Sequence, residues 1–259
     1  EADGSLVNID ITQLEIDQVP NWLWAENHMS DLYPNNILDK ILPARVSIGN
    51  IFFKNSNLGC IEFRLERQAQ KILLFDELIG EIGGIRILSP TELIWMISNE
   101  SSRTELSLTA EFDDLGFSLH QVGLPKLLET RNGNLEAAWS WKGSPVDFEI
   151  NRVTGKLDLR MDSGSFLSAN TEMTDAMRLL SLLNLSGLFR RANINQLFDP
   201  GVTFDRAVGD FEFKEGHLSI PDFAIEGSGG YFNFSSEVDL ISDTIDGELV
   251  VTLPLVENI

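Results

Sequence analysis

Hydrophobic and polar residues alternate with a period of two through much of this chain. The clearest alternating runs are residues 60–65, 71–75, 84–88, 105–112 and 156–161. This pattern is typical of β-strands that have one apolar face and one face in water. Gly, Asn, Asp and Pro separate the runs at short intervals, so the sequence predicts antiparallel strands joined by tight turns.

The last third of the chain is the most regular part. Its short alternating runs are residues 209–213, 218–220, 223–226, 232–234, 238–240 and 248–253, with a Gly-Ser-Gly-Gly turn at residues 227–230. Short connections between such runs predict a meander of hairpins. The sequence has no regular succession of strand and helix of the kind that builds a doubly wound nucleotide-binding fold, so the predicted fold class is mainly β.

Two segments break the alternation. Residues 27–42 mix polar and apolar side chains and can contain a short helix near residues 37–42. Residues 174–191 predict a clearer helix, because Thr174 suits its first position and a basic pair suits its last turn. Its apolar residues recur at helical spacing and occupy more than one side, among them Met177, Leu180, Leu183, Leu188 and Phe189. A helix of this kind is buried against something or touches lipid.

The charge balance narrows the classes of partner. The chain has 259 residues, with 40 acidic against 19 basic ones and a formal net charge of −21. This charge repels phosphate backbones, so no nucleic-acid partner is expected, and it disfavours flat adsorption to anionic lipid headgroups. The 16 Phe against 2 Tyr suit wholly apolar surroundings, since Phe has no polar tip to satisfy.

Residue patterns that carry chemistry are scarce. His28, His120 and His217 are isolated, without metal-ligand spacing, and none of the common nucleotide-binding or nucleophile motifs occurs. The acidic pair Asp113-Asp114 is interpreted as a turn. The sequence therefore predicts a protein that is not an enzyme, with no cofactor, no metal site and no catalytic residue.

Two further features have a plain structural interpretation. The single Cys60 lies in a predicted strand and is expected to be a buried, inert thiol. Trp139 and Trp141 share one face of a strand, as do Trp22 and Trp24. Such pairs can form a sugar-stacking platform, but they more often belong to a core or to the wall of a groove.

Targeting signals are missing from the sequence in hand. It has no signal peptide and no run of eighteen apolar residues, and it begins without a methionine. We therefore expect a fragment, with any anchoring or export segment upstream.

From residue 139 onward, short motifs follow one another in a recognisable order. They are Trp-Lys-Gly-Ser-Pro-Val-Asp-Phe at 141–148, Gly-Lys-Leu at 155–157, Asp-Ser-Gly at 162–164, the leucine-rich segment 178–185 with 188 and 190–191, Leu-Phe at 197–198, Gly201, Phe-Asp at 204–205, Gly-Asp-Phe at 209–211, Gly216, Asp222, Ile-Glu-Gly at 225–227, Val-Asp-Leu at 238–240 and Pro254. In their order and spacing, the chain resembles the C-terminal region of the AsmA-like family. Residues 1–138 fit as the upstream strands, and residues 139–259 as the AsmA-like C-terminal region with its helix at 174–191.

The resemblance implies an extended, curved antiparallel sheet that forms an open apolar groove, with a taco-like cross-section and a wet convex face. It implies a periplasmic lipid-transport protein that carries phospholipid between the inner and outer membranes and supports outer-membrane barrier integrity. The partners implied are phospholipid acyl chains and the two membranes, with no protein partner named. The parent protein would be anchored in the inner membrane by an N-terminal helix absent from this chain.

The predicted groove-lining residues come from the last third of the chain, where one face of successive strands is apolar. They are Phe204, Phe211, Phe213, Leu218, Ile220, Phe223, Ile225, Phe232, Phe234, Leu249 and Val251. The helix at 174–191 is expected to lie across the end of the sheet, as a plug or an outer-membrane contact.

Two other interpretations are compatible with the same pattern. The apolar faces can close into a dry sandwich core, which would make the protein a non-catalytic scaffold of the cell envelope. Alternatively, Trp139 or Trp141 can serve a polysaccharide-binding module, which requires exposed, coplanar rings flanked by polar residues.

Overall fold

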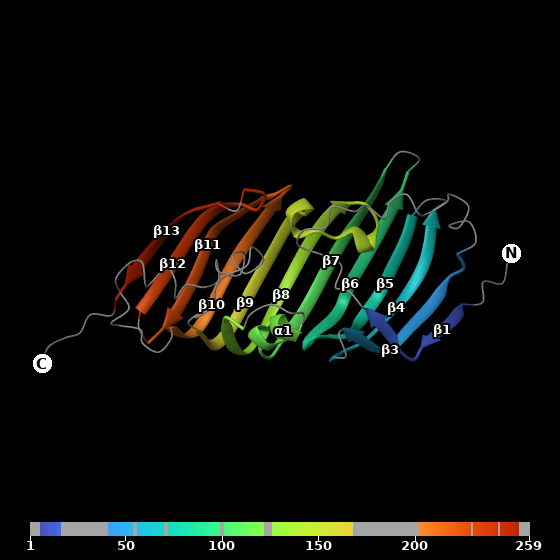
Figure 1. Ribbon diagram of the computed structural model, residues 1–259, viewed down its shortest axis with the longest axis horizontal. Coiled ribbons are helices and arrows are strands. Elements are labelled where there is room, and N and C mark those ends of the chain that lie inside the picture. Colours follow the sequence, from blue (N-terminus) through green and yellow to red (C-terminus); the bar gives the residue numbers. More distant parts are fainter. Residues whose placement is uncertain are drawn as a thin grey trace, which may run out of the picture.

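The computed structural model describes residues 6–16, 41–53, 56–69, 72–98, 101–121, 126–167, 202–228, 230–242 and 244–253. Within these ranges the chain forms one large, open and curved β-sheet (Figure 1). Its elements, in chain order, are β1 Val7–Ile11, β2 Leu14–Ile16, β3 Ala44–Phe53, β4 Ser56–Ala69, β5 Ile72–Ile82, β6 Ile85–Ile97, β7 Ser102–Phe112, α1 Leu115–Gln121, β8 Leu128–Lys142, the 3-10 turns η3 Pro145–Asp147 and η4 Ile150–Arg152, β9 Thr154–Phe166, β10 Val202–Lys214, β11 His217–Gly227, β12 Gly230–Asp239 and β13 Thr244–Thr252.

From β3 to β13, neighbouring strands in the sequence are neighbours in the sheet. Every pair along this path is antiparallel, so the meander of hairpins is confirmed. The glycine-rich segment after β11 is the predicted hairpin, with Gly227 paired to Gly230. The predicted fold class, a mainly β protein with an extended curved sheet, is confirmed.

The N-terminal edge departs from the antiparallel expectation. Both β1 and β2 pair with β3 in parallel, with Val7 opposite Ala44 and Leu14 opposite Ile51. A parallel pair needs a crossover connection of a dozen residues or more, and the long stretch between β2 and β3 provides one. Alternation within a strand cannot reveal this direction, because it is the same in both kinds of pair.

Several strands are longer than their alternating runs suggest. The runs 218–220 and 223–226 belong to the single strand β11, which continues through a register shift between Ile220 and Phe223. A bulge of this kind lets apolar residues on both sides of the shift keep to one face. The runs 232–234 and most of 238–240 are likewise joined in β12.

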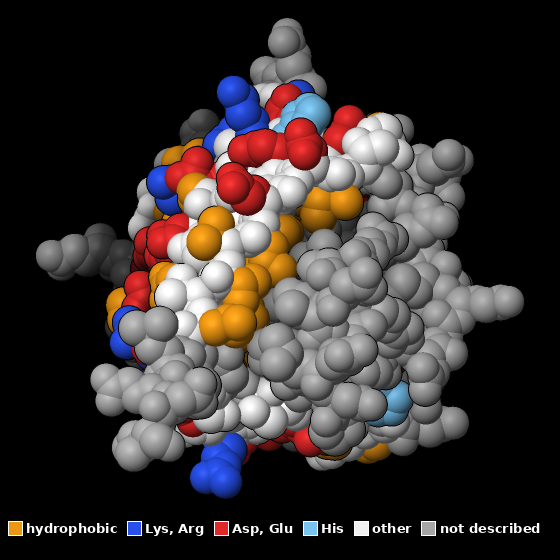
Figure 2. All heavy atoms as spheres, turned by 90° about the vertical axis from the view of Figure 1, so that its left-hand side faces the viewer, with side chains coloured by type: hydrophobic (Ala, Val, Ile, Leu, Met, Phe, Trp, Pro, Cys, Tyr) orange, Lys and Arg blue, Asp and Glu red, His pale blue; other side chains and the backbone are white. Residues whose placement is uncertain are grey.

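The two faces of the sheet differ in chemistry. Seen from the β13 end, acidic and basic side chains lie on the outer side of the sheet, and hydrophobic side chains form a band along its inner side (Figure 2). In β12 the buried residues alternate with more exposed ones, as a half-buried strand requires. We call the inner side the apolar face and the outer side the polar face.

Cys60 lies on the polar face and is exposed, so the expectation of a buried thiol was wrong. Its neighbours Ile61 and Phe63 pack on the apolar face. Because successive side chains of a strand point to opposite faces, Cys60 must then point outward. Strand parity, rather than the usual preference of cysteine for the interior, decides its position.

In the part of the chain that the structure describes, three short helical segments flank the sheet in its middle part. The helix α1 and the turns η3 and η4 lie at opposite ends of β8 (Figure 1). The predicted helices at 37–42 and 174–191, with Met177, Leu180, Leu183, Leu188 and Phe189, fall outside the described residues. In the described ranges, no helix has the length and apolar character needed to cross a membrane.

Candidate functional site

The apolar face extends across the whole sheet as three hydrophobic clusters. The first is centred on β3, where Val46, Ile48 and Ile51 pack with Ile61 and Phe63 of β4. The second joins Leu73 of β5 to Trp95 of β6. The third is the largest and extends from β7 to β13. We call the first two the N-terminal clusters and the third the C-terminal cluster.

All of the predicted lining residues lie in or against the C-terminal cluster. The buried ones are Phe204, Phe211, Phe213, Leu218, Ile220, Phe223, Ile225, Phe232 and Phe234, and Leu249 and Val251 pack against them as partly buried residues. Ile225 is 0% exposed and Phe232 1%. The structure therefore brings these side chains together, while their contact with lipid stays a prediction.

Glycines opposite aromatic residues make this close packing possible. Gly164 of β9 faces Phe204 of β10, and a Cβ atom on Gly164 would lie 2.5 Å from Phe204 Cζ. Gly209 of β10 faces Phe223 of β11 in the same way. Each ring lies over the backbone of the neighbouring strand, in space that any side chain would fill. The glycines thus let large rings lie flat on the apolar face.

The N-terminal clusters are packed less completely. Phe63 and Phe75 meet with ring centroids 5.6 Å apart, yet both side chains are only partly buried. Leu65 and Leu93, which pack beside them, are also partly buried. This part of the apolar face therefore presents hydrophobic side chains that retain some access to solvent.

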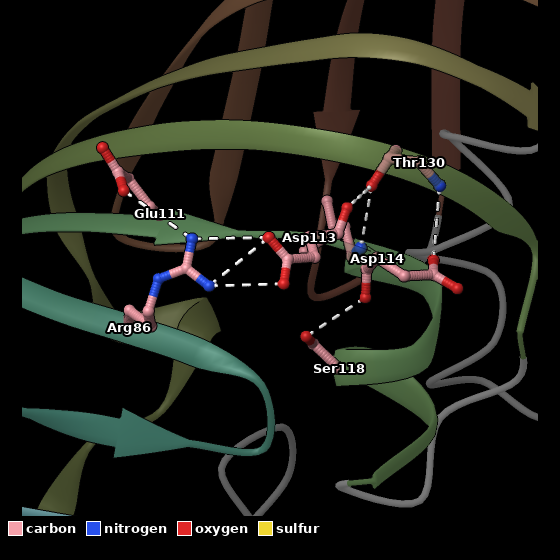
Figure 3. Close-up of polar contacts among 7 residues, drawn as sticks. Arg86, Glu111, Asp113, Asp114, Ser118 and Thr130 are labelled. Atoms are coloured by element: carbon pink, nitrogen blue, oxygen red, sulfur yellow. Dashed lines mark hydrogen bonds and ion pairs between the residues drawn. The ribbon is translucent and has the colours of Figure 1, made fainter.

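At one end of β8, a polar network holds α1 against the sheet (Figure 3). Thr130 of β8 accepts a hydrogen bond from Leu115 N at 3.0 Å and donates one to Asp113 O at 2.7 Å through the same hydroxyl. Thr130 N donates to Asp114 Oδ1 at 3.3 Å. Ser118 N and Ser118 Oγ both donate to Asp114 O. The carboxylate pair that the sequence placed in a turn therefore has a structural role at the start of α1.

The same network reaches the neighbouring strands. Arg86 of β6 pairs with Asp113 at 3.3 Å, and Asp113 raises the pKa of Arg86 through a hydrogen bond and its charge. Because Leu115 belongs to the C-terminal cluster and Leu119 packs against it, α1 covers this end of the apolar face. Sequence reasoning missed α1; the signal that could have found it is an acidic pair directly before an apolar residue, which suits a helix start.

At the other end of β8, the turns η3 and η4 cover the apolar face. The Trp141 indole donates a hydrogen bond to Ser144 O at 2.9 Å, and Asp147 Oδ2 accepts from both Ser144 N and Ser144 Oγ at 2.7 Å. Phe148 and Ile150, which follow Asp147 in the chain, pack against the C-terminal cluster. We call this end the η rim.

Aromatic rings connect the η rim with the C-terminal cluster. Trp141 and Phe148 are 5.1 Å apart with an interplanar angle of 85°, and Phe148 lies 5.8 Å from Trp139. Trp139 in turn meets Phe213 edge-on at 5.7 Å. Trp141 is buried and Trp139 partly buried, so they do not form the exposed, coplanar platform that sugar stacking requires.

The polar face carries a row of carboxylates over the middle of the C-terminal cluster. Asp210 of β10 lies directly between Asp158 of β9 and Asp222 of β11. Desolvation, a hydrogen bond with Asp158 and the two neighbouring negative charges raise the pKa of Asp210. Lys156 and Glu212 form an ion pair beside this row at 2.6 Å. In the part of the chain that the structure describes, no group of three His, Cys, Asp or Glu side chains is arranged to hold a metal.

Comparison with known proteins gives a family. A family model described as YhdP protein matches residues 6–259, which is nearly the whole chain. No curated protein and no solved structure matches. The match confirms the resemblance to AsmA-like proteins that the C-terminal motifs indicated.

Proposed function

This chain belongs to the YhdP family, and membership of this family suggests lipid transport in the cell envelope; on this basis we propose that it carries phospholipid along its apolar face. In this proposal, lipid moves between the inner and outer membranes through the periplasm, and the traffic supports the outer-membrane barrier. No catalytic step is required, since the lipid is moved rather than altered. The helix predicted at 174–191 is proposed to plug the end of the sheet or to contact the outer membrane.

The observation that carries this proposal is the continuity of the apolar face. Hydrophobic clusters follow one another from β3 to β13, and charged side chains occupy the opposite face. An acyl chain that crosses water exposes its methylene groups at a cost of about 0.8 kcal/mol each. A continuous apolar surface lowers this barrier, and weak contacts repeated at every strand allow a lipid to slide.

The partly buried residues of the N-terminal clusters are the best placed to touch a lipid. Phe63, Leu65, Phe75 and Leu93 combine hydrophobic character with some exposure. The C-terminal residues Phe211 to Phe234 are packed against one another and would have to separate before an acyl chain could lie between them. We therefore extend the proposed lipid contact to the N-terminal clusters, which the sequence did not single out.

The same close packing favours a second candidate function. If the C-terminal cluster is a permanent core, the protein is a non-catalytic scaffold of the envelope. Nine of the eleven predicted lining residues are buried, as in an ordinary core. The two candidates differ in whether lipid binds at all.

Native mass spectrometry with lipid extraction of the purified protein tests both candidates. Phe63→Asp places a charge on a partly buried position of the apolar face, and Val250→Asp places it on the polar face, where Val250 is half exposed. We expect phospholipid to co-purify with the wild type and with Val250→Asp, and to be lost from Phe63→Asp while circular dichroism stays unchanged. Absence of lipid from the wild type would overturn the transport proposal and leave the scaffold.

A further inference from the structure

A pocket of about 540 Å³ opens at the η rim, where the ends of several strands meet. Residues of β7, β8 and β9 line it together with η3, η4, the turn after β10 and the segment after β12. The buried ring of Trp141 belongs to its lining, as do the hydroxyls of Ser140 and Thr154. The pocket thus lies on the boundary between the polar face and the apolar face.

Three cationic side chains from three different elements converge on this pocket, namely Arg103 of β7, Lys142 of β8 and Arg152 of η4. Two carboxylates, Asp147 and Glu215, also line it, so the lining carries one net positive charge in a chain of net charge −21. Two more carboxylates, Glu105 and Glu149, pair with Arg103 and Arg152, so the attraction for an anion comes from directed N–H donors rather than from an excess of positive charge.

Arg152 Nε pairs with Glu149 at 3.0 Å, whereas Arg103 and Lys142 keep donors for a ligand. Arg103 Nη2 donates to Ser140 Oγ at 2.7 Å and its Nε pairs with Glu105 at 3.2 Å, which fixes the plane of the guanidinium group. Lys142 and Glu215 are 3.9 Å apart, and their side chains are 85% and 70% exposed, so this pair is loose. Arg103 is therefore oriented in advance, whereas Lys142 is free to move to an anion.

Two buried polar atoms at the η rim have no hydrogen-bond partner among the described residues. They are Asn151 Oδ1, in the lining of the pocket, and Trp139 Nε1, which lies outside the lining on the ring between Phe148 and Phe213. A buried polar atom without a partner is costly, and such atoms in native proteins call for an explanation. A ligand with a donor group, bound in the pocket, supplies one for Asn151 Oδ1.

We propose that this pocket binds the phosphate group of a phospholipid whose acyl chains lie on the apolar face. Arg103 and Lys142 donate to the phosphate oxygens, and a headgroup hydroxyl or ammonium donates to Asn151 Oδ1. The rings of Trp141, Phe148 and Trp139 guide the chains from the pocket to the C-terminal cluster. This inference rests on the proposed function and deepens it, because it assigns a docking place to the polar part of the cargo.

The chemistry of the lining fits the phosphate of a lipid headgroup. A guanidinium group offers forked donors that match two oxygens of a phosphate, and an ammonium group adds a charge without demanding a direction. The Thr154 hydroxyl can supply a further donor to a tetrahedral anion, whereas Ser140 Oγ already donates to Thr154 O. A free phosphate has the same chemistry, so the test must separate it from a lipid headgroup.

Three probes make this separation, measured by isothermal titration calorimetry on the full chain. Dihexanoyl phosphatidylglycerol carries acyl chains and phosphate, dihexanoylglycerol carries the same chains without phosphate, and glycerol 3-phosphate carries phosphate without chains. The test variant is Arg103→Gln with Lys142→Gln. The control is Arg131→Gln, because Arg131 lies on the polar face at the opposite end of β8 and is exposed.

We expect wild type and Arg131→Gln to bind dihexanoyl phosphatidylglycerol about ten-fold more tightly than dihexanoylglycerol, as one or two charge-assisted hydrogen bonds provide. The double variant should lose this difference and keep its affinity for dihexanoylglycerol. Equal affinities of the wild type for the two acyl probes would overturn the headgroup site and leave the proposed function intact.

If neither acyl probe binds, the proposed function fails instead. The result with glycerol 3-phosphate then shows whether the pocket binds phosphate. Binding that the double variant abolishes would retain a phosphate site without lipid, and absence of binding would remove the site as well.

Discussion

The N-terminal and C-terminal parts of the apolar face differ although they share one sheet and one pattern of alternation. Around β4 to β6, Phe63, Phe75 and Leu93 remain partly exposed. Around β9 to β12, Phe223 and Phe232 are buried almost completely. Alternation therefore decides which face a side chain joins, and something else decides how tightly that face is packed.

Two features account for the tighter packing of the C-terminal part. Phenylalanines there face glycines of the next strand, so their rings can lie close to the backbone. In addition, α1 and the η rim cover both ends of β8 at the start of this part. The N-terminal clusters have fewer phenylalanines, and α1 and the η segments pack against the C-terminal cluster instead. Packing density on this sheet thus follows from residue size and from what covers the strand ends.

The largest expected effect comes from removing one ring in each part. Phe223→Ala should lower the free energy of unfolding by about 3–5 kcal/mol, because it leaves a cavity in a closed cluster. Phe75→Ala, in the N-terminal part, should cost about 1–2 kcal/mol, because the ring is already partly in water. Urea denaturation of both variants measures the difference. Equal losses would show that the two parts are packed alike.

A smaller effect is expected from filling the space opposite a ring. Gly209→Ala places a methyl group against Phe223, and the forced shift should cost about 1–3 kcal/mol. Gly49→Ala in β3 is the matched change in the N-terminal part. Its Cβ atom would lie 3.3 Å from Thr12 O, so a loss below about 1 kcal/mol is expected. Thermal unfolding of the two variants provides the comparison, and a neutral Gly209→Ala would contradict the role of the glycine.

The cover over one end of the C-terminal part can be loosened on its own. Thr130→Val keeps the shape of the side chain but removes the hydroxyl that bonds Leu115 N and Asp113 O. Two backbone groups then lose a partner, for a cost of about 1–2 kcal/mol. Hydrogen exchange should accelerate in α1 more than in β11. Uniform acceleration throughout the sheet would mean that α1 is not a separate cover.

The smallest expected change in stability comes from charged residues on the polar face. In the N-terminal part Arg45 pairs with Glu77, whereas in the C-terminal part Asp210 lies between two other carboxylates. The raised pKa of Asp210 means that its ionised form is disfavoured in the folded state, so the contribution of this one group to stability falls as the pH rises through the carboxyl range. Asp210→Asn should therefore stabilise the protein at neutral pH by about 0.2–1 kcal/mol.

That gain should vanish as the pH falls below the ordinary pKa of a carboxyl group, where Asp210 is protonated in both the folded and the unfolded state. Glu77→Gln is the opposite case, because it removes a partner of Arg45 and should cost a few tenths of a kcal/mol, as is usual for an exposed pair. Denaturation at several pH values measures both variants. A gain for Asp210→Asn that persisted in acid would argue against charge repulsion as its cause.

The sequence predicted the strands and the sharing of one face well, because both depend on local alternation. Even across the register shift of β11, the run of Phe223 and Ile225 signals the correct face, since only one face of the strand is apolar. Cys60 was assigned to the interior from its residue type. Its neighbour Ile61 packs on the apolar face, so strand alternation places Cys60 on the polar face. The local pattern is thus sufficient to assign each side chain to one face of the sheet, provided that it is followed along the whole strand.

What the sequence could not predict depends on contacts between distant residues. The parallel pairing of β1 and β2 with β3 spans a long connection that leaves no mark on the strands themselves. The pocket at the η rim joins Arg103 to Arg152, which are separated by the whole of β8 and its connections. Neither residue has a motif around it, and only the ordered sheet brings the two together. Residue periodicity also gave no sign of how deeply the C-terminal cluster is buried.

Because the strands from β3 to β13 pair in the order of the sequence, the width of the sheet is set by the number of strands. Each strand contacts mainly the strand before it and the strand after it, and each adds about 4.8 Å to the width of the sheet. Insertion or loss of one hairpin would therefore change the reach of the protein by about 10 Å while leaving its cross-section the same. A chain of this design can be lengthened by duplicating hairpins, because each added strand packs against its neighbours in the way the existing strands do.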